Sequence, residues 1–302
     1  MNISEIKGPV MMLLSSLLFA IMAVFVKLAS ASLPAEEIAF VRFMFGVVVC
    51  LVLAAAGVIS LASGKKSLLV ARGVFGGLAI LLYFASIQQG TMTNAAVLNN
   101  AYPIFVTLLA PFLLKEKNGK SVFGALIVAF AGVMLLTHPD FRHIRNADIL
   151  GLASALMAGV AIVVVRALRK TESAWSVFFY LSLFGAGFSG MLAIPKMVIN
   201  TSPETGYMLL AALFGMLAQV TMTSAYRYCT AAVGSVLSIS TALFSAVFGL
   251  LFMGESMSAM EGLGAVAIIA GSAWGAAAQG SVSGTKEPEA NEAEANKTKE
   301  IG

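Results

Sequence analysis

Charged residues are scarce in this chain, because Asp, Glu, Lys and Arg together make up 11% of its 302 residues. A water-facing domain carries about a quarter of its residues as charges. With 59% hydrophobic residues and a mean hydropathy of +0.91, most side chains must face hydrocarbon or one another. The composition therefore excludes a soluble enzyme, a disordered chain, a coiled coil and a nucleic-acid-binding protein.

Residues that bind metals or form disulfides are also few. Cys50 and Cys229 both lie in apolar runs, where a buried thiol is the usual state. His138 and His143 lie in a loop without a carboxylate at metal-ligand spacing. The glycine-rich run 262–267 matches a dinucleotide fingerprint, but it lies in an apolar span with no preceding strand. We expect no metal, no cofactor and no enzyme activity.

Long apolar runs are what the chain has in abundance. A helix needs about 20 apolar residues to cross the hydrocarbon layer. Ten such runs are predicted, at 8–29, 35–56, 67–88, 92–114, 119–137, 147–168, 174–194, 205–227, 230–253 and 259–278. The sequence thus predicts an all-α integral membrane protein with ten transmembrane helices.

The first five runs repeat in the last five. Sliding the chain on itself by 139 residues aligns them without a gap and pairs Lys27 with Arg166, Thr91 with Thr230, Glu116 with Glu255 and Gly132 with Gly271. Because five is odd, the second copy enters the membrane from the opposite side, which gives two inverted five-helix repeats. The predicted division is 1–137 for the first repeat, 138–146 for a loop, 147–278 for the second repeat and 279–302 for a disordered tail.

The distribution of Lys and Arg predicts the orientation, since these residues favour the cytoplasmic side. With a cytoplasmic N-terminus, the outer side carries Lys27, Arg142, Arg145 and Lys196. The inner side then carries Lys7, Lys65, Lys66, Lys115, Lys117, Lys120, Arg166, Arg169, Lys170, Arg227, Lys286, Lys297 and Lys299. Both termini are expected in the cytoplasm, and the chain in the inner membrane among its lipids.

The fourth run carries a family resemblance. Its residues 90–98, then Tyr102-Pro103-Ile104-Phe105 and Lys115-Glu116-Lys117, resemble the fourth span of the drug/metabolite transporter superfamily, EamA type. The copy at 229–234 through Glu255 is similar but lacks the proline. Lys27 and Arg42 also fit the pattern of that family. The resemblance covers 8–278 and implies a ten-helix carrier with a central cavity lined by spans from both halves.

Polar residues inside spans are costly unless they face a cavity or a neighbouring helix. The densest set lies on the fourth run, where Asn99 and Tyr102 share one helix face with Asn100 beside them. The 139-residue offset maps Asn99 to Ser238 and Tyr102 to Thr241. These five residues are candidates for the substrate cavity, and the alternative is interhelical hydrogen bonding.

Pro103 should kink the fourth span, because it removes the backbone hydrogen bond to the carbonyl of Asn99. Tyr83 in the third span and Gln219 in the eighth are further cavity candidates. Tyr226 lies near a helix end, where anchoring at the membrane interface is the expected role. Arg166 is likewise expected to extend toward the interface from its helix end.

Arg42 lies about two turns into the second span, too deep to reach water easily. No Asp or Glu lies in the middle of any run, so a bound cation would lack a compensating charge. We therefore expect a secondary transporter of small organic metabolites, with amino-acid-like or other carboxylate-bearing compounds favoured, that works by alternating access. The alternatives are a non-transporting scaffold, a lipid-binding protein and an intramembrane enzyme. The repeat and the polar positions in both copies favour transport.

Overall fold

The computed structural model describes residues 3–30, 33–89, 97–116, 118–138, 145–197, 203–252 and 258–284. Within these residues, ten helical segments are long and apolar enough to span a membrane, as the sequence predicts. The helices are α1 (Ile3–Ala29), α2 (Ala35–Ala55), α3 (Lys66–Gln89), α5 (Tyr102–Leu114), α6 (Lys120–Thr137), α7 (Asn146–Leu168), α8 (Ala174–Ala193), a 3₁₀ turn (Ile194–Lys196), α9 (Pro203–Ala225), α10 (Ala231–Ser238), α11 (Ser240–Phe252) and α12 (Ala259–Gly284).

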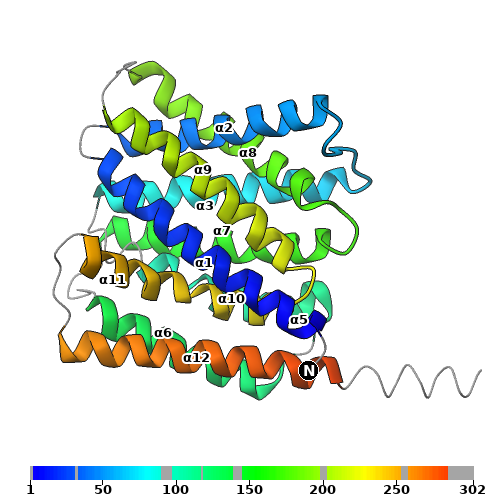
Figure 1. The fold of residues 1–302 in the computed structure, drawn as a ribbon, viewed down its shortest axis with the longest axis vertical. Helices are drawn as coiled ribbons and strands as arrows, with labels where there is room; N and C mark the ends of the chain where they lie inside the picture. The colour runs from blue at the N-terminus through cyan, green and yellow to red at the C-terminus, as the bar shows by residue number, and fades with distance from the viewer. Residues whose placement is uncertain are drawn as a thin grey trace, which may run out of the picture.

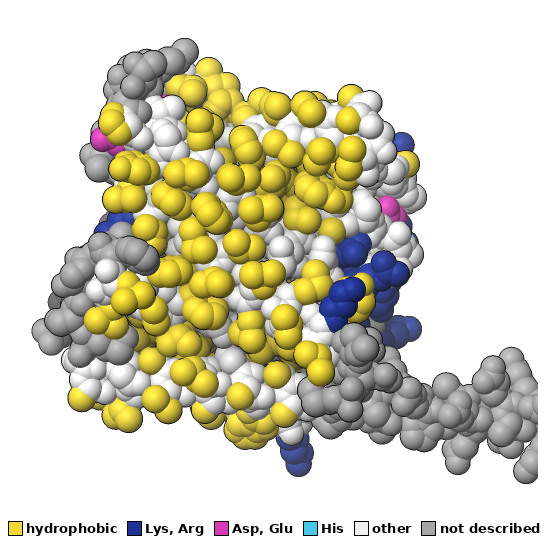
Figure 2. Space-filling view, viewed as in Figure 1, with side chains coloured by type: hydrophobic (Ala, Val, Ile, Leu, Met, Phe, Trp, Pro, Cys, Tyr) yellow, Lys and Arg dark blue, Asp and Glu magenta, His cyan; other side chains and the backbone are white. Residues whose placement is uncertain are grey.

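The helices stack in one bundle with α2 and α8 along one side and α6 and α12 along the other (Figure 1). The visible face is covered by hydrophobic side chains, and Lys and Arg gather mainly at the end where α9 turns into α10 (Figure 2). Large apolar side chains such as Phe112 and Met191 are 83% and 76% exposed. Such exposure is favourable only in lipid, so the chain is a multi-pass membrane protein.

Helix neighbours come in pairs that follow the repeat. The contact of the first span with the eighth, α1 with α9, is matched by that of the sixth with the third, α7 with α3. In the same way α2 with α9 matches α8 with α3, and α1 with α11 matches α7 with α5. Each half therefore packs against the other through equivalent surfaces, which is the arrangement expected of an inverted repeat.

Small residues hold α6 against α12 at backbone contact. A Cβ on Gly132 would lie 2.7 Å from the carbonyl oxygen of Gly264 and 2.8 Å from the amide of Ile268. A Cβ on Gly271 would lie 2.6 Å from the amide of Ala129. Helices in lipid associate through this kind of close packing, because lipid tails give no hydrophobic force between them.

The predicted end of the last helix differs from the structure. The helix predicted at 259–278 continues as α12 to Gly284, into the segment expected to be a tail. The rest of that segment, 285–302, lies outside the described residues, as do 90–96, Lys117, the loop 139–144 and the stretch 253–257 with Glu255.

Candidate functional site

The α-helical structure of the fourth and ninth spans is interrupted inside each span, at positions that the repeat matches. In the fourth span, the helix at 97–99 ends in a turn at Asn100 and Ala101, and α5 begins at Tyr102. In the ninth span, α10 ends at Ser238 and α11 begins at Ser240, with Ile239 between them. Asn100 and Ile239 are 139 residues apart, so each half contributes one discontinuous helix.

The two breaks have different chemical causes. Pro103 lies in the first turn of α5, where a missing N–H costs nothing, and the break falls where the sequence predicts a kink. The ninth span has no proline. There Ile239 donates its amide to the carbonyl of Val236 at 3.1 Å, and Ser238 Oγ donates to the carbonyl of Ser235 at 2.6 Å. A serine hydroxyl replaces the backbone donor that a continuous helix would supply.

The breaks bring two of the predicted site residues together. The hydroxyl of Tyr102 forms a hydrogen bond with Ser238 Oγ. The amide nitrogen of Asn99 instead donates to Ser154 Oγ at 2.8 Å, and Ser154 donates to the carbonyl of Ala79. This chain of bonds links the fourth span to α7 and α3, which is the interhelical role that the sequence left open for Asn99.

The other predicted residues lie on several different helices and on the turn before α5. Tyr83, Asn100 and Thr241 are half-buried on α3, on the turn before α5 and on α11. Gln219 is buried on α9, and its Nε2 has no hydrogen-bond partner in the described part of the chain. Arg42 extends from α2 to α9, because a Cβ on Gly215 would lie 2.8 Å from Arg42 Nε.

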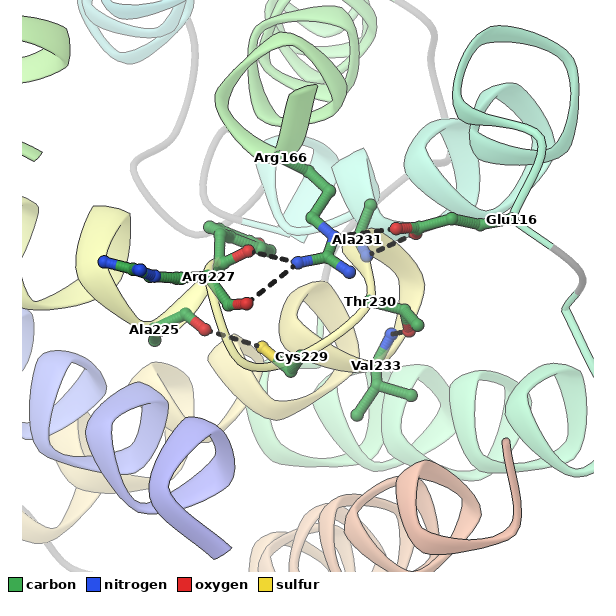
Figure 3. A network of polar contacts seen from close by, with 9 residues as sticks. Glu116, Arg166, Ala225, Arg227, Cys229, Thr230, Ala231 and Val233 are labelled. Carbon is green, nitrogen blue, oxygen red and sulfur yellow. Dashed lines mark hydrogen bonds and ion pairs between the residues drawn. The ribbon is translucent and has the colours of Figure 1, made fainter. Parts of the chain in front are cut away.

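An ion pair joins the two halves at the end of the bundle where α9 turns into α10. We call this end of the bundle the latch end. Arg166 Nε donates to Glu116 Oε1 at 2.7 Å, and the two side chains are 17% and 11% exposed. Glu116 follows α5 in the first repeat, whereas Arg166 lies in the last turn of α7 in the second. We call this pair the latch (Figure 3).

Both members of the latch also bind helix termini. Glu116 Oε2 accepts from the amide of Ala231 at 3.0 Å, at the start of α10. Arg166 Nη1 donates to the carbonyls of Tyr226 at 2.7 Å and Arg227 at 3.2 Å, just after α9 ends. An anion at a helix N-terminus and a cation at a C-terminus are both favourable. The expectation that Arg166 extends toward the interface is therefore wrong, because its donors are used inside the protein (Figure 3).

The turn under the latch is tightly packed. Tyr226 is fully buried and its hydroxyl has no partner among the described residues, so the expectation that it anchors at the interface is wrong. Cys229 is also fully buried, and its thiol donates to the carbonyl of Ala225. The pKa of the Cys229 thiol is raised to about 12, mainly by burial, with the charge of Arg166 opposing the shift and that of Glu116 adding to it.

A concave surface of about 350 Å³ lies elsewhere, on the outside of α8. Its lining is apolar and consists of Ala186, Gly187, Gly190, Met191, Ile194 and Pro195. It includes none of the predicted site residues, and Met191 is strongly exposed on the lipid-facing surface. The groove therefore suits contact with lipid chains and not the polar chemistry of the bundle centre.

Known proteins of similar sequence are transporters. The pseudopaline exporter CntI of Pseudomonas aeruginosa is 31% identical over 269 residues, covering 87% of this chain and 93% of the exporter. Solute carrier family 35 member G1 of Mus musculus is 26% identical over 79% of this chain and 70% of its own. The riboflavin transporter of Rhizobium johnstonii is 26% identical over 67% of each chain.

A solved crystal structure shares the fold, with a TM-score of 0.76 at 16% identity over 89% of this chain and 96% of its own. The EamA-like transporter family matches the chain twice, at residues 6–138 and 145–274. Those two matches coincide with the two repeats, and the relatives are transporters rather than enzymes. With both halves matched and the ten spans in place, the chain belongs to the EamA-like transporter family.

Proposed function

We propose that the chain is a secondary transporter that moves small carboxylate-bearing metabolites across the inner membrane by alternating access, with both termini in the cytoplasm. Transport of small molecules is the common theme of the relatives, which include an exporter of pseudopaline and a transporter of riboflavin. The carboxylate preference rests on the in-span charges. Arg42 and Arg72 lie inside apolar helices, and no Asp or Glu lies in the middle of a described span.

The observation that carries the proposal is the pair of matched breaks in the fourth and ninth spans. Breaks inside transporter spans free backbone groups and polar side chains that can bind a substrate. They do so at a depth in the membrane that water from either side does not reach directly. Tyr102 and Ser238 meet at these breaks, one from each repeat. Asn99, Asn100, Tyr83, Gln219, Arg42 and Thr241 complete the proposed lining of the path.

The latch supplies one of the two gates that alternating access requires. The support for this is that the pair of Glu116 and Arg166 joins the first half to the second at the latch end. The repeat maps Glu116 to Glu255 and Arg166 to Lys27. Glu255 lies outside the described residues.

The experiment is a two-step assay on the purified full-length chain. A thermal-shift screen of amino acids, organic acids, amines and quaternary ammonium compounds first identifies ligands. Radiolabelled ligands are then offered to proteoliposomes, with competition by the other classes. Acids and zwitterions should inhibit uptake of the radiolabelled ligand. Arg42→Gln should weaken their inhibition relative to that by neutral compounds. Best competition by quaternary ammonium compounds contradicts the charge preference, whereas binding of lipid alone with no uptake favours the scaffold alternative.

A further inference from the structure

Four of the seven buried side-chain atoms without a hydrogen-bond partner in the described chain gather along one strip. They are Arg72 Nε, Gln219 Nε2, Thr223 Oγ1 and the hydroxyl of Tyr226, and their residues are at most 5% exposed. Gln219, Thr223 and Tyr226 follow one another at spacings of four and three on α9 and the turn after it. They therefore share one helix face. Leu69, about one turn before Arg72 on α3, packs in the same buried cluster as Met222 and Tyr226, which brings Arg72 to this end of the strip, and Arg72 and Tyr226 interact electrostatically.

Arg72 points away from the membrane surface nearest to it. Its helix begins at Lys66 at the latch end, and helical side chains normally tilt back toward the helix N-terminus. The Arg72 guanidinium instead lies on Gly76, one turn further into the membrane, where any Cβ would overlap its Nη1. Leu181 closes the same spot from α8. A long basic side chain that could extend to the interface is thus held at depth, with Gly76 providing the space.

The opposite end of the strip carries a second arginine in an equivalent place. Gly215, one turn before Gln219 on the same face of α9, contacts Arg42 Nε. Gly76 and Gly215 are 139 residues apart and so are matched by the repeat. The two arginines are not matched, since Arg42 pairs with Leu181 and Arg72 with Ala211 in that alignment. The two halves place a guanidinium on equivalent glycines from different helices.

The unpartnered atoms have one chemical property in common. Guanidinium Nε and amide Nε2 are donors without acceptor capacity, and both hydroxyls can donate. Among the described residues, no carboxylate lies at ion-pair distance from Arg72. Burying a cation among donors that have no acceptor costs free energy unless an anion pairs with the cation and accepts from those donors. Arg72 in particular presents the planar fork that carboxylates bind.

We propose that Arg72, with Tyr226, Thr223 and Gln219, binds the carboxylate group of the substrate in the state whose latch is closed. This proposal deepens the proposed function and rests on it for the identity of the ligand as a transported metabolite. The carboxylate accepts from Arg72 and from the hydroxyls of Thr223 and Tyr226, while the remainder of the substrate extends along α9 toward Tyr102 and Ser238. Arg42 is the cation at the other end of the strip.

The test measures binding to the full-length purified chain with matched probe pairs: hippurate and hippuramide, N-acetylglycine and N-acetylglycinamide, succinate and succinamide. Each pair is compared at equal ionic strength by thermal shift and equilibrium dialysis. At least one carboxylate should raise the melting temperature of the wild type while its amide does not. Arg72→Gln should abolish that shift or weaken the Kd by about tenfold or more, as expected for a charge-assisted contact.

Arg227→Gln is the matched control, because it removes an exposed positive charge at the same end without touching the strip. It should keep the carboxylate shift of the wild type. Gly76→Ala keeps every charge but displaces the guanidinium, so it should weaken carboxylate binding as Arg72→Gln does.

Tyr226→Phe and Thr223→Val separate a binding role from a structural one, since each removes a buried hydroxyl that has no partner in the structure. A hydroxyl that bonds only to a bound ligand does not stabilise the ligand-free protein. Both variants should therefore melt at or above the wild-type temperature when no ligand is present. Their carboxylate shift should nevertheless shrink.

The proposal is overturned if Arg72→Gln keeps the carboxylate shift, if amides stabilise the wild type as well as their acids, or if no acid stabilises it. It is also overturned if Tyr226→Phe and Thr223→Val lower the melting temperature of the empty protein and leave the shift intact. Failure of the proposed function has a different signature. In that case carboxylates bind through Arg72, but no proteoliposome accumulates or releases them.

Discussion

Tyr102 begins the helix that follows one break, and its hydroxyl meets Ser238, which ends the helix that precedes the other break. The two residues come from opposite halves, so their hydrogen bond lies across the boundary between the halves. A single contact of this kind links the geometry of both discontinuous spans. Changes on either side should therefore affect the same step of transport.

Tyr102→Phe and Asn99→Ala should each reduce transport in proteoliposomes while membrane abundance stays near that of the wild type. Tyr102→Phe and Ser238→Ala together should cost little more than either alone, because both remove the same hydrogen bond. The rates of the three variants, normalised to folded protein, give this coupling. Loss of folded protein in step with activity would assign these residues to packing instead.

Glu116→Gln and Arg166→Gln should each destabilise the chain by about 1–3 kcal/mol, because each leaves a partly buried charge without its partner. The double exchange Glu116→Arg with Arg166→Glu should fail to restore stability. In the exchanged protein an arginine would face the amide of Ala231, and a glutamate would face the carbonyls of Tyr226 and Arg227. Thermal unfolding in detergent measures this. Full rescue by the exchange would show that the helix termini are unimportant.

Cys229 reports on the latch through its reactivity, once Cys50 is replaced by Ala. Only the thiolate reacts with N-ethylmaleimide. With a pKa of about 12, the rate at Cys229 should still rise about tenfold for each pH unit above pH 8.5. An ordinary thiol levels off in that range. Glu116→Gln should accelerate labelling at every pH, because it opens the turn. Rates that level off near pH 9 in the wild type would mean that the turn is open to solvent.

Gly132→Ala should lower stability by about 1–3 kcal/mol, because the new methyl group would meet the backbone of α12. Gly187→Ala on α8 is the matched control. A Cβ there meets nothing within 4 Å, so the variant should be neutral or gain up to about 1 kcal/mol from helix propensity. The melting temperatures of the two variants in the same detergent measure whether the loss of stability is specific to the contact of α6 with α12. Equal effects would exclude close packing of α6 on α12 as the cause.

Topology can be tested with reporters. A reporter fused after Asn118 should read cytoplasmic, and one fused after Arg142 should read external, since a single span separates them. The charge asymmetry of the loops is the physical reason. Alkaline phosphatase and fluorescent-protein fusions measure the two sides independently. The same reading at both positions would contradict the inverted ten-span arrangement.

The spans and the repeat could be predicted from the sequence because both depend on composition and spacing alone. The break in the fourth span could also be predicted, because Pro103 lacks the backbone N–H that a continuous helix needs. The break at Ile239 could not, because serines are compatible with continuous helices and their effect depends on where each hydroxyl points. Ser235 and Ser238, three residues apart, were the available signal.

Side-chain partners at helix ends were less predictable. Arg166 and Tyr226 both lie where hydropathy indicates an interface, but hydropathy records distance from a span end and not which way a residue faces. Glu116, Arg166 and the turn at 226–230 come together only after three helix ends have packed. The position of the Arg72 guanidinium could not be predicted for the same reason, since nothing in the sequence indicates that it folds inward onto Gly76.

The break at Ile239 differs from the one at Pro103 because residue 239 keeps the backbone N–H that a proline lacks. If the Ser238 hydroxyl rotates away, the amide of Ile239 can bond to the carbonyl of Ser235, and α10 and α11 then join into one rod. Pro103 has no N–H to return to Asn99, so its helix can never straighten in this way. A fold built of two equivalent halves thus contains one interruption that proline makes permanent and one that depends on the position of a single serine hydroxyl.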